Sequence, residues 1–225
     1  IMKLSNYTTS VLKNFSTINQ NLVIKEGNTI TTMSAMKNIV AKAEVEETFP
    51  QQIAIYDLNE FLGALSLFTS PVLDFSDNYV MISEENKPTT KMKYFYSDPS
   101  VVTSPNKMIT MPSNEVKFTM SSEDLSRLKR AAGAIGAPDM VLEKDGSSSS
   151  LTVKDKKNDT ANNYSLDVDT TSEGEFNFYF KVENMKLLDG NYDVEISSKN
   201  ISHYTNKSTD IEYWIALEPE STYTV

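Results

Sequence analysis

The chain has no cysteine among its 225 residues, a single histidine, His203, and only seven glycines. Without cysteine there are no disulfides, thiol nucleophiles or cysteine-ligated zinc and iron–sulfur sites. One histidine cannot build a multi-histidine metal site, and no glycine-rich phosphate-binding motif occurs. These absences argue against most enzyme classes. Carboxylate-pair hydrolases remain, because 31 acidic residues can always supply a pair.

Long hydrophobic runs are also missing. The broken apolar run at residues 61–68 is far shorter than the roughly 18 residues that a membrane span needs. Polar residues follow Met2 and Lys3, so the apolar core of a signal peptide is absent there. We therefore expect a soluble, intracellular protein that does not engage a membrane.

Basic residues are outnumbered, with 21 Lys and Arg against 31 Asp and Glu, and the net charge is −10. This balance excludes a generally basic nucleic-acid surface but leaves room for a locally basic one. Hydrophobic residues make up 39% of the chain, which is enough for a core, so the acidity does not indicate disorder.

Proline marks one stretch of the chain, residues 98–113, which we call the strap. It contains three of the eight prolines, Pro99, Pro105 and Pro112. Such clustering predicts a connector, and the length of the chain allows a domain on each side of it, residues 2–97 and 114–225. Apolar residues inside the strap favour a tethered segment over a free linker.

A repeat appears on both sides of the strap. Four segments, starting near Thr8, Asp57, Ser122 and Val182, place apolar residues at helical spacing. Each is followed by alternating segments typical of antiparallel strands. The pattern predicts an α+β chain of two similar domains, each with two helices packed on antiparallel sheets. The apolar positions are Val11, Phe15 and Ile18; Leu58, Phe61, Leu62 and Leu65; Leu125, Leu128, Ala132 and Ile135; and Val182, Met185 and Leu188.

An ordered set of short segments resembles the sliding clamps that serve as DNA polymerase processivity factors in T-even-type bacteriophages. The segments are MKLS (2–5), LKNF (12–15), IAIYDLN (53–59), PNK (105–107), EDL (123–125), FNF (176–178), NMK (184–186), GNY (190–192), YWIAL (213–217) and EST (220–222). The resemblance implies the DNA-clamp fold and a homotrimeric ring without a catalytic centre or cofactor. The ring would encircle duplex DNA of any sequence and tether the replicative DNA polymerase and other replication proteins. An ATP-dependent clamp loader is a further implied partner, and the implied location is the cytoplasm of the infected bacterial host.

The ring can be checked by simple geometry. Three chains with four helices each supply twelve helices, each about 10 Å across. Placed side by side, they make a ring with a diameter of about 38 Å measured between helix axes, and its central hole is about 28 Å in diameter. A duplex and a layer of water fit through such a hole.

Cations on the predicted helices are candidates for the DNA-facing surface. Arg127, Lys129 and Arg130 lie on the third helical pattern away from its apolar face, Lys13 does so on the first and Lys186 on the fourth. With the resemblance, we expect these five residues to make water-mediated phosphate contacts that carry no sequence information. The alternative is that they are ordinary solvated helix residues. The second helical pattern offers no outward cation.

The resemblance also implies a pocket for apolar partner peptides beside the strap and the C-terminal tail. Such a pocket needs an apolar patch with polar edges. The alternative is that these side chains close the core between the domains. The candidates are Val101, Val102, Met108 and Ile109 in the strap, and Ala216, Leu217 and Pro219 in the tail.

Other residues that could carry chemistry have simpler interpretations. Trp214 lies in a predicted strand, where sheet packing is the favoured role. His203 has no acid or nucleophile arranged around it in sequence, and we expect a surface residue. Asp167 and Asp169 could hold a hard cation, although exposed acids are the default. A carboxylate-based hydrolase and a non-catalytic structural or adhesion β-rich phage protein remain as alternative functions.

Overall fold

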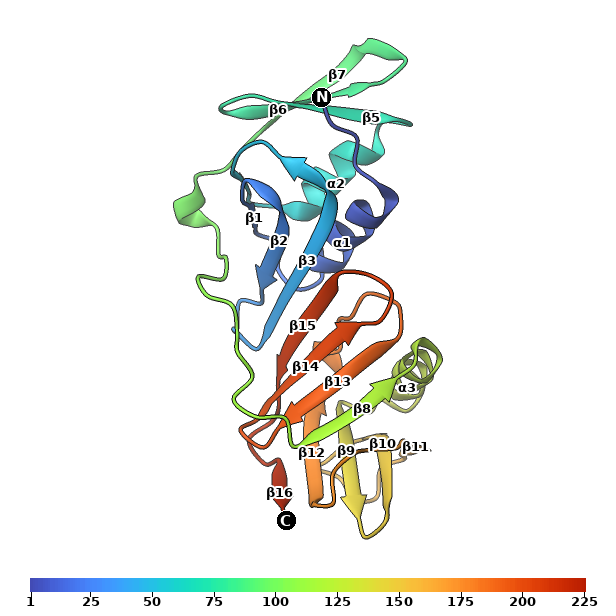
Figure 1. Ribbon diagram of the computed structural model, residues 1–225. Helices are drawn as coiled ribbons and strands as arrows, with labels where there is room; N and C mark the ends of the chain where they lie inside the picture. The colour runs from blue at the N-terminus through green and yellow to red at the C-terminus, as the bar shows by residue number, and fades with distance from the viewer. The chain divides into compact units, whose positions relative to one another are not determined.

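The computed structural model describes residues 1–225, which form two compact units, residues 1–108 and 109–225 (Figure 1). We call them unit 1 and unit 2. The boundary between Met108 and Ile109 lies inside the strap. Each unit has its own helix or helices, antiparallel strands and buried apolar residues.

Unit 1 contains two helices, α1 (Asn6–Ser16) and α2 (Leu58–Ser66), and two antiparallel groups of strands. One group has the order β4-β1-β2-β3, and the other has the order β5-β6-β7. The strands are β1 (Leu22–Ile24), β2 (Gly27–Met33), β3 (Ile39–Phe49), β4 (Ile53–Ile55), β5 (Pro71–Phe75), β6 (Tyr79–Glu84) and β7 (Lys87–Phe95).

Both helices of unit 1 begin at side-chain caps and bury the predicted face. The Ser5 hydroxyl accepts from the Thr8 N–H at 3.1 Å, and the Asp57 carboxylate accepts from the Glu60 N–H at 3.2 Å. Each bond satisfies a backbone donor that the first helical turn leaves free. Their buried apolar residues include Phe15 on α1 and Phe61 on α2. The first two predicted helices are confirmed.

Unit 2 contains one α-helix, α3 (Ser122–Ile135), and two antiparallel groups of strands. One has the order β15-β14-β13-β8, and the other has the order β11-β10-β9-β12-β16. The strands are β8 (Val116–Met120), β9 (Asp139–Asp145), β10 (Ser148–Lys154), β11 (Tyr164–Asp167), β12 (Glu175–Lys181), β13 (Tyr192–Ser197), β14 (Ile201–Asn206), β15 (Ile211–Ala216) and β16 (Thr222–Thr224).

Local signals at both ends define α3. The Ser121 hydroxyl accepts from the Asp124 N–H at 3.0 Å. Gly136 ends the helix in the left-handed region, with φ +65°, which glycine adopts without steric cost. Leu125 and Leu128 are buried beneath the helix, as their spacing predicts. The third predicted helix is confirmed.

The fourth predicted helix is wrong. Residues 182–184 form a single 3-10 turn, and Met185 leaves the helical region with φ −80° and ψ 57°. The backbone N–H of Leu188 donates to the Tyr213 hydroxyl at 2.9 Å, and the Tyr192 hydroxyl donates to the Leu188 carbonyl. Tertiary partners therefore take both backbone groups that a helix would have used, and unit 2 keeps one α-helix instead of two.

This correction also changes the ring geometry. Each chain has three α-helices, so three chains supply 3 × 3 = 9 instead of twelve. The estimate of a hole lined by twelve equal helices does not hold for this chain. The two-domain arrangement of helices on antiparallel sheets is otherwise as predicted. No helix of the structure is both long enough and apolar enough to cross a membrane.

Candidate functional site

The outward face of α3 gathers three of the five cations predicted to face DNA. Arg127, Lys129 and Arg130 are all exposed on this helix. Arg127 pairs with Glu123 one turn earlier at 2.6 Å, and Arg130 donates from Nε to the Ser126 carbonyl at 3.4 Å. Since Glu123 offsets part of the charge of Arg127, Arg130 is the less neutralised of the two arginines.

Lys129 lies at the edge of a cleft of about 930 Å³ at the C-terminal end of α3. Desolvation in this cleft lowers the pKa of Lys129, while the carboxylate of Asp189 partly opposes the change. Arg127 and Arg130, three residues apart, lie on neighbouring positions of the helix surface, and Lys129 lies to one side of them at the cleft.

The other two predicted cations are placed differently. Lys13 is exposed in the last turn of α1, where a cation favourably meets the negative end of the helix dipole. Lys186 is half-buried and follows the 3-10 turn, so it does not lie on a helix face. On α2, Asn59 and Glu60 are exposed and no cation is present. The structure thus groups only the three cations of α3.

The strap residues predicted to form a partner pocket divide into exposed and buried members. Val101 is 57% exposed and Met108 is 42% exposed. Val102 is buried in a cluster with Val23 and Ala54 of unit 1, and Ile109, the first residue of unit 2, is half-buried. Of the four predicted strap residues, Val101 and Met108 are therefore the exposed ones.

The tail residues are held on unit 2. Leu217 is buried, Ala216 is half-buried and Pro219 is exposed. The backbone N–H of Leu217 donates to the Asn200 carbonyl at 3.0 Å, and that of Glu218 donates to the Tyr179 carbonyl at 2.8 Å. These bonds fix the start of the tail against the ends of neighbouring strands.

Ion pairs add to this attachment, and sequence reasoning missed them. Lys181 lies 3.6 Å from Glu218, and Lys156 pairs with Glu220. Burial alone would lower the pKa of Lys156, but its hydrogen bond to Glu220 and the charge of nearby Asp139 raise it. Residues 64 positions apart gave no sequence signal for this contact.

His203 is not the surface residue that the sequence suggested. Its side chain is 19% exposed and stacks on Trp214, with ring centroids 4.8 Å apart. Carboxylate oxygens of Glu195 and Glu212 lie 4.0 and 3.7 Å from its ring nitrogens. The reason is that β14 runs between β13 and β15, whose cross-strand neighbours cover it. The packing role predicted for Trp214, which is 5% exposed, is confirmed.

The cation site considered at Asp167 and Asp169 gains no support. Both residues are exposed, at the end of β11 and just beyond it. Among residues 1–225, no group of three or more Asp, Glu and His side chains is placed to hold a metal ion.

Two edge strands carry opposite charges. Residues 86–97, which contain β7, include three lysines and no acid, whereas residues 158–173, which contain β11, include four acids and no cation. β7 is the outer strand of β5-β6-β7, and β11 is the outer strand of β11-β10-β9-β12-β16. Phe95 on β7 is 64% exposed and Tyr164 on β11 is 38% exposed. Edge strands of this kind present unpaired backbone groups to another chain.

Comparisons with known proteins agree along the whole chain. Residues 3–103 match the family described as DNA polymerase processivity factor, and residues 117–219 match the one described as gp45 sliding clamp, C terminal. The sliding clamp of Vibrio phage KVP40 is 32% identical over 223 residues, covering 96% of this chain and 99% of the relative. The sliding clamp of Enterobacteria phage T4 is 31% identical over 229 residues, covering 99% of both chains.

Solved structures show the same fold at low identity. The proliferating cellular nuclear antigen of Entamoeba histolytica superposes with a TM-score of 0.67 at 15% identity, covering 93% of this chain and 94% of that one. A chain of the PCNA2–PCNA3 complex of Sulfolobus tokodaii gives a TM-score of 0.67 at 11% identity, covering 94% and 96%.

Proposed function

This chain belongs to the phage sliding clamps of the DNA polymerase processivity factor family, and we propose that it forms a homotrimeric ring around duplex DNA and tethers the replicative DNA polymerase. The ring acts as a mechanical tether without a catalytic centre of its own. Two clamp domains, residues 2–97 and 114–225, are joined by the strap, residues 98–113. An ATP-dependent loader places the ring on DNA in the cytoplasm of the infected host.

The complementary edges of β7 and β11 carry the assembly proposal. In each interface, β7 of one copy meets β11 of the next, so that Lys91 and Lys93 face Asp167 and Asp169. A contact between two different surfaces is head-to-tail, and it closes into a ring when the rotation per copy divides a full turn. The exposed Phe95 and Tyr164 supply apolar contact area at the same edges.

Charge reversal tests this interface. Wild type is expected at about three times 25.3 kDa in analytical ultracentrifugation. Lys91→Glu with Lys93→Glu should dissociate it, because like charges then face each other across the interface. Adding Asp167→Lys and Asp169→Lys should restore the trimer. The control is Lys37→Glu with Lys199→Glu, which changes the net charge equally at exposed turns. If the lysine variants dissociate the trimer and the added Asp167→Lys and Asp169→Lys do not restore it, β11 is not the partner of β7 in the interface.

The cations of α3, together with Lys13 and Lys186, form the DNA-facing surface in this proposal. Support comes from the exposure of Arg127, Lys129 and Arg130 on α3, with Arg127 and Arg130 at neighbouring positions of its surface. Arg127→Glu with Arg130→Glu should shorten retention on nicked circular DNA while the trimer persists, since the phosphate attraction is lost. Arg127→Gln with Arg130→Gln should show a smaller loss. Unchanged retention in both variants would remove these residues from the DNA-facing surface.

Partner peptides dock on the apolar residues of the strap and the tail in this proposal. The strap contributes Val101, Val102, Met108 and Ile109, and the tail contributes Ala216, Leu217 and Pro219. The exposed residues among these are the direct test, because changing Val102 or Leu217 would disturb buried packing. Val101→Ser with Met108→Ser should weaken polymerase binding and leave trimer formation unchanged. Equal polymerase affinity would place the docking surface elsewhere.

Topology separates the clamp from the alternative functions. A ring is retained on circular DNA and is released when the circle is cut, whereas a hydrolase or a structural β-rich phage protein is indifferent to the cut. We expect the protein to leave the DNA when the circle is cut, and we expect retention on the intact circle only for variants that form the trimer. Retention that does not depend on topology would contradict the proposed function.

A further inference from the structure

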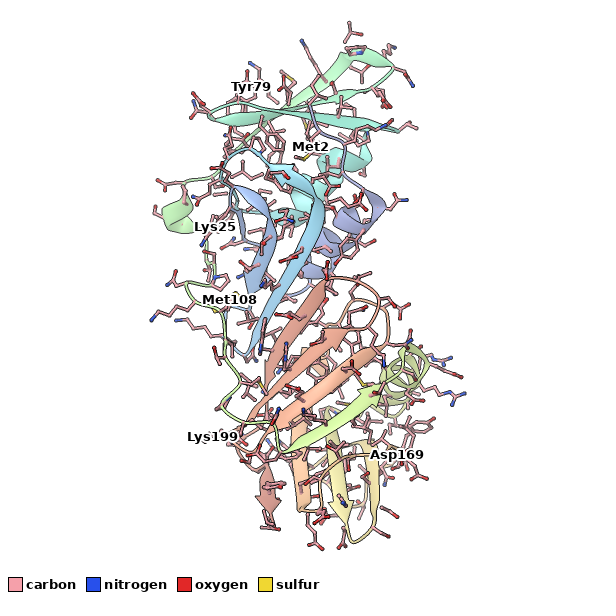
Figure 2. The ribbon with its side chains drawn as sticks, viewed as in Figure 1. Met2, Lys25, Tyr79, Met108, Asp169 and Lys199 are labelled. Carbon is pink, nitrogen blue, oxygen red and sulfur yellow. The ribbon has the colours of Figure 1, made fainter.

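A basic groove of about 410 Å³ lies on unit 1, between the turn that joins β1 to β2 and the last residues of the strap in this unit. Figure 2 labels Lys25 at that turn and Met108 in the strap, along the same margin of unit 1. Lys25, Lys42 and Lys107 line the groove, together with one acid, Glu26. No other charged side chain lines it.

The groove exists because the strap is attached to unit 1 up to Pro105 and is more open afterwards. The Ser97 N–H donates to the Ala54 carbonyl at 2.8 Å. Val102 packs with Val23 and Ala54, and Pro105 is buried. Residues 106–108 are exposed. One wall of the groove is therefore formed by the exposed residues 106–108, which follow a part of the strap that is packed on unit 1.

The charge of the groove contrasts with that of the whole chain. Three lysines and one acid give it two net positive charges, while the chain carries ten net negative charges. None of the three lysines forms an ion pair within unit 1. Their charge is therefore available to a ligand, and it comes from the β1–β2 turn, β3 and the strap.

The remaining lining suits an extended peptide. Thr29 and Thr31 on β2 and Asn106 in the strap supply hydrogen-bonding side chains, while Met108 supplies an exposed apolar one. A groove of a few hundred Å³ accommodates a short peptide segment and is too small for a duplex about 20 Å wide. It also contains no arginine or helix N-terminus, the groups that recognise phosphate with fixed geometry.

We propose that this groove binds an acidic, extended segment of a partner protein, with an apolar side chain of that segment against Met108. The inference rests on the proposed function, because a tether must recruit partners, and it adds the chemical class of the segment recruited. Carboxylates of the partner pair with Lys25, Lys42 and Lys107. Such pairs direct approach and select against basic partners.

The experiment uses a fluorescein-labelled ten-residue peptide of Glu, Asp and Ser with one central Leu, titrated with the full chain in low salt. The triple variant Lys25→Glu, Lys42→Glu, Lys107→Glu is expected to weaken binding at least tenfold. Lys37→Glu with Lys199→Glu, two exposed turn lysines outside the groove, is expected to change it less than twofold. A peptide with Gln and Asn in place of Glu and Asp should bind at least tenfold more weakly to wild type.

Changes in the NMR chemical shifts of backbone amides show where the peptide binds. The acidic peptide should shift the amides of Thr29, Thr31 and Met108, and raising salt to 0.5 M should reverse the shifts because exposed charges are screened. Equal weakening by the two sets of lysine variants, or shifts confined to other residues, would overturn the proposal. Binding of a labelled single-stranded oligonucleotide that depends on the three lysines, without binding of the peptide, would also overturn it.

The outcome is separable from that of the clamp function. A wild type that forms trimers and is retained on circular DNA, but does not bind the acidic peptide, refutes the groove alone. A wild type that binds the peptide through the three lysines, but ignores DNA topology, refutes the clamp function and leaves the groove as a peptide site.

Discussion

The two units differ in what becomes of the second helical pattern in each. In unit 1, apolar residues at helical spacing behind the cap Asp57 form the nine-residue α2. In unit 2, a comparable spacing behind Lys181, which makes no side-chain cap hydrogen bond, yields a three-residue 3-10 turn. The comparison shows that three apolar residues at helical spacing do not suffice. A cap must begin the helix, and no tertiary group may compete for its backbone.

The difference extends to charge. In unit 2, α3 carries three exposed cations, while in unit 1 α2 has none and α1 contributes only Lys13. The positive helix surface of the chain is therefore concentrated on one helix. Variants that alter helix ends and anchors in each unit can test how these differences arise.

The largest effect is expected from the tyrosine that holds the Leu188 backbone. Tyr213→Phe keeps the buried ring and removes the acceptor of the Leu188 N–H, so a backbone donor loses its partner. We expect a loss of about 1–3 kcal/mol in the free energy of unfolding, measured by urea denaturation, and faster amide exchange at Leu188. The control is Tyr79→Phe in unit 1, whose ring keeps its contact with Lys93. Equal stabilities of the two variants would show that Tyr213 does not determine the turn.

Replacing Gly133, in α3, and Gly136, at its C-cap, by alanine should change the stability of the protein in opposite directions. Gly136→Ala forces an alanine into the left-handed C-cap at φ +65°, at a cost of about 1–2 kcal/mol. Gly133→Ala adds a methyl group that meets no atom within 4 Å and should stabilise the helix by about 0.5 kcal/mol. Thermal unfolding of the paired variants measures both. Destabilisation by Gly133→Ala would mean that its site is more crowded than the structure shows.

A pH-dependent effect concerns two carboxylates that anchor backbone N–H groups, one in each unit. Burial raises the pKa of Glu115 in unit 2, but hydrogen bonds from the Ser198 hydroxyl and N–H outweigh it and bring the pKa to about 2. Burial likewise raises the pKa of Glu47 in unit 1, and hydrogen bonds from the Thr8 hydroxyl and the Ser5 N–H bring it below the ordinary value of 4.5.

Because folding lowers the pKa of both carboxyl groups, each ionised carboxylate stabilises the fold above pH 4.5. The stabilisation from Glu115 is lost as the pH falls from 4.5 towards 2. After allowance for solvent screening, we expect about 1 kcal/mol from Glu115. Urea denaturation at pH 5, 4 and 3 should show a shallower decline for Glu115→Gln than for wild type. Glu47→Gln provides the same comparison in unit 1, and a decline as steep as that of wild type in both variants would contradict the assignment.

Much of the fold was predictable because its signals are local. The caps Ser5, Asp57 and Ser121 act on N–H groups three residues away, and the apolar faces of α1, α2 and α3 follow from a period of 3.6 residues. The same periodicity assigned the cations of α3 to its exposed side. The ordered segments that identify the family are likewise a property of the sequence.

The features that sequence reasoning missed depend on residues far apart in the chain. His203 is covered by Glu195 and Trp214 from neighbouring strands, and no pattern around His203 indicates them. The pairing of Lys156 with Glu220, and the groove that brings Lys107 near Lys25 and Lys42, arise in the same way. Such contacts form only after the strands have paired.

By itself, then, the sequence determined the family, the places where α1, α2 and α3 begin, and the acidic balance with its few cations on helix faces, because each depends on neighbours within a few residues or on composition. Only the tertiary structure decided that the fourth helical pattern becomes a 3-10 turn, that β7 and β11 are oppositely charged sheet edges, and that three lysines share a groove on unit 1. The physical reason is that hydrogen bonds such as that between Leu188 and Tyr213, 25 residues apart, compete with local preference once the chain has folded.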